Sequence, residues 1–332
     1  MTTPTHTVGT AAGLVAFHDE GEGPPVLLLH GFPASSWQWR DFVPLLAARF
    51  RVIAPDLPGA GVSEPADGVT LDLATLADTM RALIDSLGIE RYAIVAHGTG
   101  AGVAQLLALD GEGVDALVLL GAATLDAWPS PGIRRARERL SAEVATPTLA
   151  RSLVRGAFEA GAIRRERLSD EVLDAYAEPY ATGDGPERLA RVLAGLDGRG
   201  LAGREAALGV LEAPTLILWG EDDPVYPVSV GERLNAAMPS STLGLLPGCG
   251  HFLVEEAADT LGPMISEYLR ARYAHAPHGH GDPNAGIVML QLERRPPWAD
   301  LEEYERDEWF DPPGDVEAKE ATADEHEEGS AP

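Results

Sequence analysis

The chain has 332 residues, 45% of them hydrophobic, which is enough for one large domain or for a core with an inserted subdomain. The formal net charge of −27 argues against nucleic-acid binding, which requires basic patches. The single cysteine, Cys249, excludes a disulfide framework and a cysteine-rich metal site.

The first part of the chain alternates short apolar runs with helical patterns. Residues 24–32 ("PPVLLLHGF") form an apolar run that ends in His-Gly, typical of a buried strand and a tight turn, and residues 51–63 repeat this form. A helical pattern over 71–88 and strands over 92–97 and 115–121 follow. Strands that are apolar throughout and alternate with helices predict a parallel sheet covered on both faces.

The alternation stops in the middle of the chain and then resumes. Residues 128–211 show four helical segments and no comparable strand, whereas strand patterns return at 214–227 and 241–252, before a final helix to residue 274. We therefore expect a core made of residues 1–125 and 213–274. A helical cap, residues 126–212, is expected to cover one end of the sheet.

The C-terminal tail, residues 275–332, is different in composition. From Asp282 onward it has 16 acidic and 4 basic residues, and we expect it to be largely disordered. The histidines at 275, 278 and 280 lie in a Gly/Pro-rich linker and predict a solvated spacer, not a metal site. The aromatic residues of the tail predict either docking onto the body or binding of another protein.

The stretch "VAHGTGAGVAQLLAL" (residues 95–109) has the pattern of a strand, a sharp turn and a helix. In enzymes this turn presents a nucleophile in a G-x-nucleophile-x-G frame, with small neighbours that allow close packing. Ala96, Gly100 and Gly102 supply the small residues. Gly98, however, stands where Ser, Cys or Asp would be expected.

Five segments carry a family resemblance: "LLLHGFPASSWQWR", "VIAPDLPGAGVS", "VAHGTGAG", "ILWGEDDPVYP" and "GCGHF". In this order they resemble the α/β-hydrolase superfamily, over a region from about Leu14 to Ala274. The resemblance implies an α/β fold with a mostly parallel central sheet, helices on both faces and an inserted helical cap.

The resemblance also implies roles for individual residues. His251 is at the position of the base, and Asp223, directly before Pro224, is at the position of the acid that orients it. The oxyanion hole would consist of the backbone N–H groups of Phe32 and Thr99. These donors do not depend on the side chain at Gly98.

"HGFPASSWQWR" is most similar to the epoxide hydrolase and haloalkane dehalogenase branch. Phe32 and Thr99 stand where dehalogenases commonly hold the halide with Asn and Trp, which argues against dehalogenation. Tyr176 and Tyr180 are candidates for the cap tyrosines that protonate an epoxide oxygen, although tyrosines four apart on a helix are also common core residues.

Several explanations of Gly98 remain open. His251 and Asp223 could activate water for direct attack, with no covalent intermediate, or the protein could be an inactive pseudo-hydrolase that binds a small molecule. Thr99 could act as a substitute nucleophile, or His251 could abstract a proton in a lyase or isomerase reaction. An engineered loss of the nucleophile is also conceivable, but the whole "HGTGA" stretch differs from the usual pattern.

A small apolar or aromatic organic molecule is the expected partner. We expect its pocket between sheet and cap to be lined by six aromatic residues: Phe32, Trp37, Trp128, Tyr176, Tyr180 and Phe252. No nucleotide-binding or phosphate-loop motif occurs, so no cofactor is expected, and no metal. No apolar run reaches membrane-spanning length and no signal peptide is recognised, so a cytoplasmic location with no membrane association is expected.

Overall fold

The structure, a computed structural model, describes residues 4–111, 113–197 and 199–274. The predictions for the tail, including its histidines, its aromatic residues and its disorder, lie outside the described residues.

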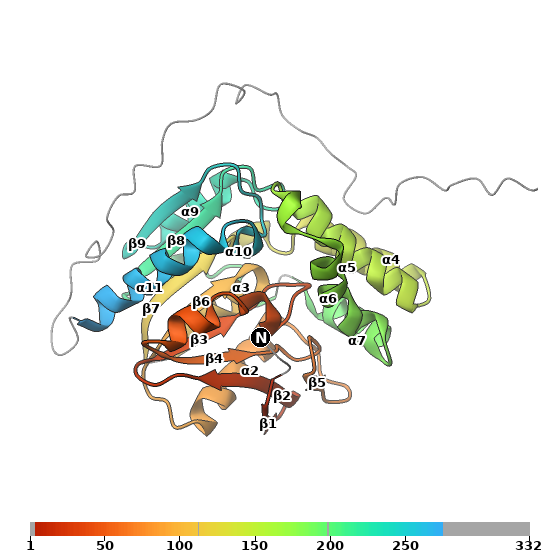
Figure 1. Cartoon of the computed structure of the whole chain (residues 1–332), viewed down its shortest axis with the longest axis horizontal. Coiled ribbons are helices and arrows are strands. Elements are labelled where there is room, and N and C mark those ends of the chain that lie inside the picture. Colours follow the sequence, from red (N-terminus) through yellow and green to blue (C-terminus); the bar gives the residue numbers. More distant parts are fainter. Residues whose placement is uncertain (1–3, 112, 198, 275–332) are drawn as a thin grey trace, which may run out of the picture.

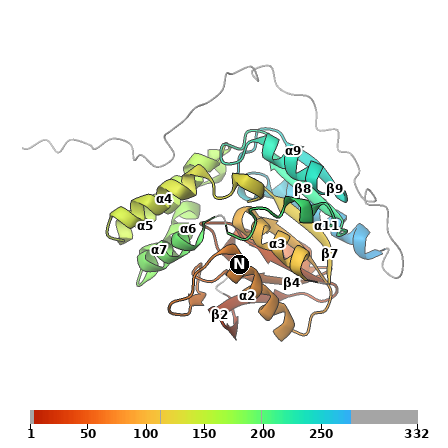
Figure 2. The same cartoon turned by 180° about the vertical axis from the view of Figure 1, so that it is seen from behind.

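Within the described part of the chain, nine strands form one sheet (Figures 1 and 2). They are β1 (His6–Thr10), β2 (Gly13–Glu20), β3 (Pro25–Leu29), β4 (Arg51–Pro55), β5 (Glu64–Pro65), β6 (Tyr92–His97), β7 (Val114–Leu120), β8 (Thr215–Gly220) and β9 (Ser241–Leu246). Their order is β1-β2-β4-β3-β6-β7-β8-β9, with β5 beside β2. All pairs from β4 to β9 are parallel and the pairs of β2 are antiparallel, so the predicted mostly parallel sheet is confirmed.

Side chains alternate between the two faces of the sheet and build two cores. Leu27 and Leu29 of β3 belong to one core, and Val26 and Leu28 to the other. The first core is completed by α2 (Leu73–Ser86), α3 (Gly98–Asp110), α8 (Glu205–Leu208) and α9 (Val228–Ala237). The second is completed by α1 (Val43–Ala47), α10 (Leu253–Glu256) and α11 (Ala258–Ala274). Both faces are therefore covered by helices, as the apolar strands predict.

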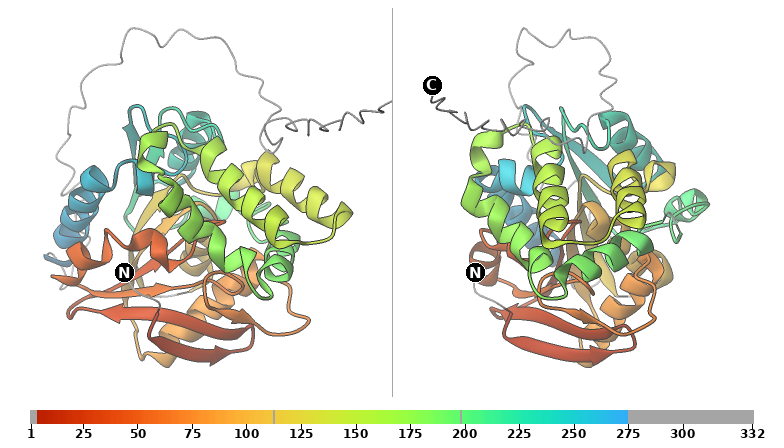
Figure 3. Two further views of the ribbon diagram at one scale, coloured as in Figure 1. Left: turned by 45° about the vertical axis from the view of Figure 1, so that its right-hand side comes forward. Right: turned by 90° about the vertical axis from the view of Figure 1, so that its right-hand side faces the viewer.

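Four helices follow β7 and gather on one side of the molecule (Figure 3). They are α4 (Pro131–Ala142), α5 (Pro147–Gly161), α6 (Asp170–Ala181) and α7 (Gly185–Gly195). Ser130, Thr146 and Ser169 cap the first three of them, each accepting a hydrogen bond from a backbone N–H of the first turn. Their common core also contains Ala60 and Phe252 from the sheet-bearing part, so the helices pack directly on the carboxyl ends of the strands.

Candidate active site

The turn between β6 and α3 has the geometry of a nucleophile elbow. β6 ends at His97 in extended conformation, and the helix begins at Gly98, whose φ is +51°. A side chain at Gly100 would be impossible, because its Cβ would lie 2.5 Å from the carbonyl oxygens of Leu29 and His30. The glycine at position 100 is therefore required by close packing of α3 against the end of β3.

The space next to Gly98 is open. A Cβ added to Gly98 would lie 3.5 Å from His251 Nε2 and 3.6 Å from Gly31 Cα, which are ordinary contact distances. The positive φ would strain any other residue by about 1–3 kcal/mol, and glycine avoids this cost. Gly98 thus relaxes the elbow and leaves room for a small group beside the imidazole.

His251 and Asp223 form the predicted pair. Asp223 Oδ2 lies 3.0 Å from His251 Nδ1, and both side chains are buried. Asp223 Oδ1 accepts hydrogen bonds from the backbone N–H groups of Val225 at 2.7 Å and Tyr226 at 2.9 Å, which fixes the carboxylate. This network assigns the proton to Nδ1 and leaves Nε2 as an acceptor on the side of Gly98.

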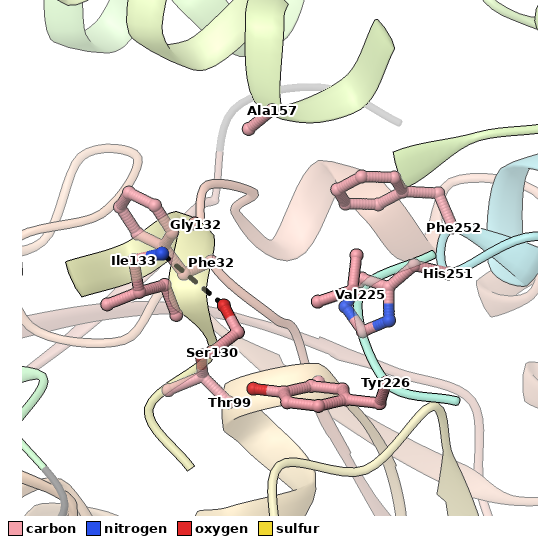
Figure 4. A pocket seen from close by; sticks show the side chains of 11 residues that line it. Phe32, Thr99, Ser130, Gly132, Ile133, Ala157, Val225, Tyr226, His251 and Phe252 are labelled. Carbon is pink, nitrogen blue, oxygen red and sulfur yellow. Dashed lines mark hydrogen bonds between the residues drawn. The ribbon is translucent and has the colours of Figure 1, made fainter. Parts of the chain in front are cut away.

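A cavity of about 430 Å³, part of it open to solvent, is lined by His251 (Figure 4). Gly98 and His251 line it together with Phe32, Thr99, Ser130, Gly132, Ile133, Ala157, Val225, Tyr226 and Phe252. The backbone N–H groups predicted as the oxyanion hole, those of Phe32 and Thr99, therefore belong to residues of the cavity wall. Thr99 is in the first turn of α3, where N–H groups have no acceptor within the helix.

Four of the expected aromatic residues do not line this cavity. Tyr180 lines a second cavity behind Phe32, and Trp128, 5% exposed, packs in the first sheet core. Trp37 and Tyr176 lie edge to face, with a ring separation of 4.9 Å. Trp37, Trp128 and Tyr176 therefore line neither cavity, because aromatic character alone does not tell a buried core residue from one that faces a cavity.

The Tyr176 hydroxyl has a structural partner that excludes it as a proton donor in the cavity. It donates a hydrogen bond to Glu255 Oε1, which also accepts one from Arg40 at 2.7 Å. The Arg40 guanidinium lies 3.9 Å above the Trp37 ring. We name Arg40, Glu255 and Tyr176 the buried clamp, because they connect α6 to α10 and to the segment after β3.

Two polar residues of the cavity, Ser130 and Tyr226, were not predicted from the sequence. Ser130 is the N-cap of α4, and its Oγ accepts a hydrogen bond from Ile133 N at 3.3 Å. Tyr226 lies beside His251, with a ring separation of 5.4 Å, and its hydroxyl points toward the wall that carries Ser130 (Figure 4). Burial raises the pKa of Tyr226 above its ordinary value, so the hydroxyl keeps its proton. Two sequence features could have indicated these residues: the Ser-Pro pair that begins a helix, and the position of Tyr226 in the loop directly after Asp223.

A chain of buried hydrogen bonds connects the oxyanion turn to the base. Gly31 N donates to Gln38 Oε1 at 3.2 Å, and Gln38 Nε2 donates to His97 Nδ1 at 3.1 Å. His97 Nε2 then donates to the carbonyl oxygen of His251 at 2.9 Å. This arrangement requires neutral His97, and burial lowers the pKa of His97 to about 3.

Acidification is expected to weaken the fold through His97. The unfolded chain takes up this proton near its ordinary pKa of 6.5 and the folded protein only near 3, so between these values a falling pH favours unfolding. The contribution is about 1.4 kcal/mol per pH unit. In urea unfolding between about pH 6 and pH 4, His97→Gln should lose stability with a slope shallower by this amount than that of the unaltered protein. Equal slopes would show that folded His97 takes up the proton.

A metal-binding cluster and a membrane-spanning helix are both absent from the residues that the structure describes. These residues contain no group of three or more His, Cys, Asp or Glu side chains placed to hold a metal ion. None of their helices is both long and apolar enough to cross a membrane.

Comparison with known proteins identifies the family of the chain. A family model described as the alpha/beta hydrolase fold matches residues 24–258. Haloalkane dehalogenase 2 of Mycobacterium tuberculosis is 29% identical over 78% of this chain and 92% of its own length. The 2-hydroxy-6-oxo-6-phenylhexa-2,4-dienoate hydrolase of Burkholderia cepacia is 29% identical over 77% and 91%. The crystal structure of an alpha/beta hydrolase fold protein from Burkholderia ambifaria, 29% identical, covers 80% of this chain and 98% of its own, with a TM-score of 0.73. The chain belongs to the alpha/beta hydrolase family, and its relatives include the dehalogenase branch.

Proposed function

We propose that the protein hydrolyses a small apolar or aromatic ester or epoxide by direct attack of water, with His251 as general base and Asp223 as the residue that orients it. The observation that carries this proposal is the space beside His251 Nε2. Where a family member would carry its nucleophile, Gly98 leaves room for a small group within contact distance of the acceptor nitrogen.

In the proposed reaction, His251 Nε2 takes a proton from water while the water oxygen attacks the carbonyl carbon or the epoxide carbon. With an ester, the tetrahedral intermediate then breaks its C–O bond to the alcohol, and the imidazolium returns the proton to the leaving oxygen. With an epoxide, the ring C–O bond breaks as water attacks, and the ring oxygen then takes the proton from the imidazolium. The N–H groups of Phe32 and Thr99 stabilise the oxyanion of the ester reaction. Asp223 orients His251 and stabilises the imidazolium through Nδ1. The apolar walls of the cavity, and a relative whose substrate carries a phenyl group next to a carbonyl, support an aromatic or apolar substrate.

The test is turnover of 4-nitrophenyl acetate and styrene oxide by the purified protein, by His251→Ala and by His6→Ala. Loss of a general base costs about 10²–10⁴ in rate, so His251→Ala should fall by this factor. The exposed His6 of β1 is the matched control, and its variant should retain the full rate. Equal rates in all three proteins, or rates at the level of buffer, would contradict the proposal.

The second candidate function is binding without turnover, which Gly98 itself favours. Loss of the nucleophile from a triad costs several powers of ten in rate, and the elbow strain it relieves would stabilise a binding protein. In this case ligands of the cavity would raise the melting temperature, and His251→Ala would change only their affinity. A proton abstraction by His251 in a lyase or isomerase reaction remains the third candidate.

A further inference from the structure

A second cavity, of about 320 Å³, lies next to the first. Phe32 and Thr99 line both cavities, so the two share a wall at the proposed oxyanion hole. Both volumes include space that is open to solvent. The second cavity is bounded by the loop after β4, by α2 with the turn before it, and by α7.

The lining of the second cavity is mostly apolar. Leu57, Leu71, Leu76, Val192 and Leu196 form most of the wall, and Ala34 and Ala60 add two small side chains. His30 also lines it, but both of its ring nitrogens are already used. His30 Nε2 accepts from Leu57 N at 2.9 Å, and Nδ1 lies 2.9 Å from the Gly31 carbonyl oxygen, so this ring offers a ligand nothing.

Two hydroxyl groups of the second cavity differ from this pattern. Thr99 is 5% exposed and Tyr180 is 2% exposed, and neither hydroxyl has a hydrogen-bond partner among the described residues. Neither hydroxyl is among the fully buried, unpaired side-chain atoms of the described residues, so each is open to hydrogen bonding from the cavity. Burial also raises the pKa of Tyr180 above its ordinary value, so its hydroxyl is a donor. Thr99 comes from the elbow and Tyr180 from α6, so one donor lies on each side of the boundary between body and cap.

We infer that the second cavity is a subsite for an aliphatic chain that bears a carbonyl oxygen, with the hydroxyls of Thr99 and Tyr180 as its hydrogen-bond donors. The aliphatic wall excludes charged groups, which would be desolvated without a counter-ion. The wall shared through Thr99 places this subsite beside the reacting centre. The inference deepens the proposed function: a substrate would keep its reacting group near His251 and its aliphatic carbonyl part beyond Thr99.

The experiment measures binding, so that it does not depend on turnover. The probes are 2-heptanone and n-heptane, titrated by ligand-observed NMR into the unaltered protein and variants. Ala60→Leu fills the second cavity alone and Ala157→Leu fills the first alone, which makes them a matched pair. We expect 2-heptanone affinity to fall at least tenfold in Ala60→Leu and less than threefold in Ala157→Leu.

The hydroxyl variants test the donors without changing the volume. Tyr180→Phe and Thr99→Val should each weaken 2-heptanone about threefold to tenfold, the usual net effect of one hydrogen bond, and leave n-heptane unchanged. Equal losses for both probes, unchanged ketone affinity in Ala60→Leu, or no binding to the unaltered protein would overturn the inference. Ketone binding with this pattern but no ester or epoxide turnover would overturn only the proposed function. Turnover without the pattern would overturn only the subsite.

Discussion

Replacing Gly98 with serine is expected to raise the rate of aryl ester hydrolysis by about 10² or more and to produce a covalent acyl-enzyme. A Cβ at this position would lie 3.5 Å from His251 Nε2, so a hydroxyl one bond farther can reach hydrogen-bond distance. The base, its carboxylate and the oxyanion donors are already in place. Initial rates and the intact mass of protein quenched during turnover measure both effects.

The control for this experiment is Gly98→Ala. Alanine has the same Cβ and the same strain at a φ of +51°, about 1–3 kcal/mol, but no nucleophilic atom. It should show neither the rate increase nor the mass adduct. Gly98→Asp should give an alkyl-enzyme with styrene oxide. If serine and aspartate behave like alanine, the donors or the base are not aligned with the elbow.

Glu255→Gln is expected to destabilise the fold by about 3 kcal/mol in urea unfolding. The Glu255 carboxylate is 2% exposed and accepts hydrogen bonds from Arg40 and Tyr176. Removing its charge leaves a largely buried guanidinium without an anion, and this cost is larger than that of an exposed pair. The same change weakens the contact between α6 and α10.

Glu267→Gln is the matched control for the buried clamp. Glu267 forms an ion pair with Arg270 in which both side chains are about half exposed, and such pairs contribute about 0–1 kcal/mol. The two variants lose the same charge and differ mainly in burial. Equal destabilisation by both would show that the buried clamp contributes no more than a surface ion pair.

The central parts of the fold and the site follow from short sequence patterns. The elbow and the mostly parallel sheet depend on residues within one turn or one strand, whereas the His251–Asp223 pair was implied by the resemblance to the α/β-hydrolase superfamily. The glycine at position 100 is required by its contact with the end of β3, where a Cβ would meet the carbonyl oxygens of Leu29 and His30. These features could be predicted because local geometry and function impose the same residue types.

Three of the expected lining residues, Trp37, Trp128 and Tyr176, line neither of the two cavities, for a different reason. The partner of Tyr176 is Glu255, which is 79 residues away, and no local pattern tells that the hydroxyl faces a carboxylate. Tyr180, four residues later on α6, lines a cavity instead. The link from Gln38 to His97 likewise spans 59 residues. Such contacts depend on how the elements pack against one another in space, which the periodicity of apolar residues in the sequence does not specify.

One measurement tests the central account most directly: the intact mass of the unaltered protein, quenched during hydrolysis of 4-nitrophenyl acetate, with product quantified in the same sample. Attack by water activated at His251 predicts product formed over many turnovers and a protein mass that stays unchanged. A mass increase equal to one acetyl group on a residue of the cavity would show a covalent nucleophile, and product no higher than in His251→Ala would show that the imidazole does not act as a base.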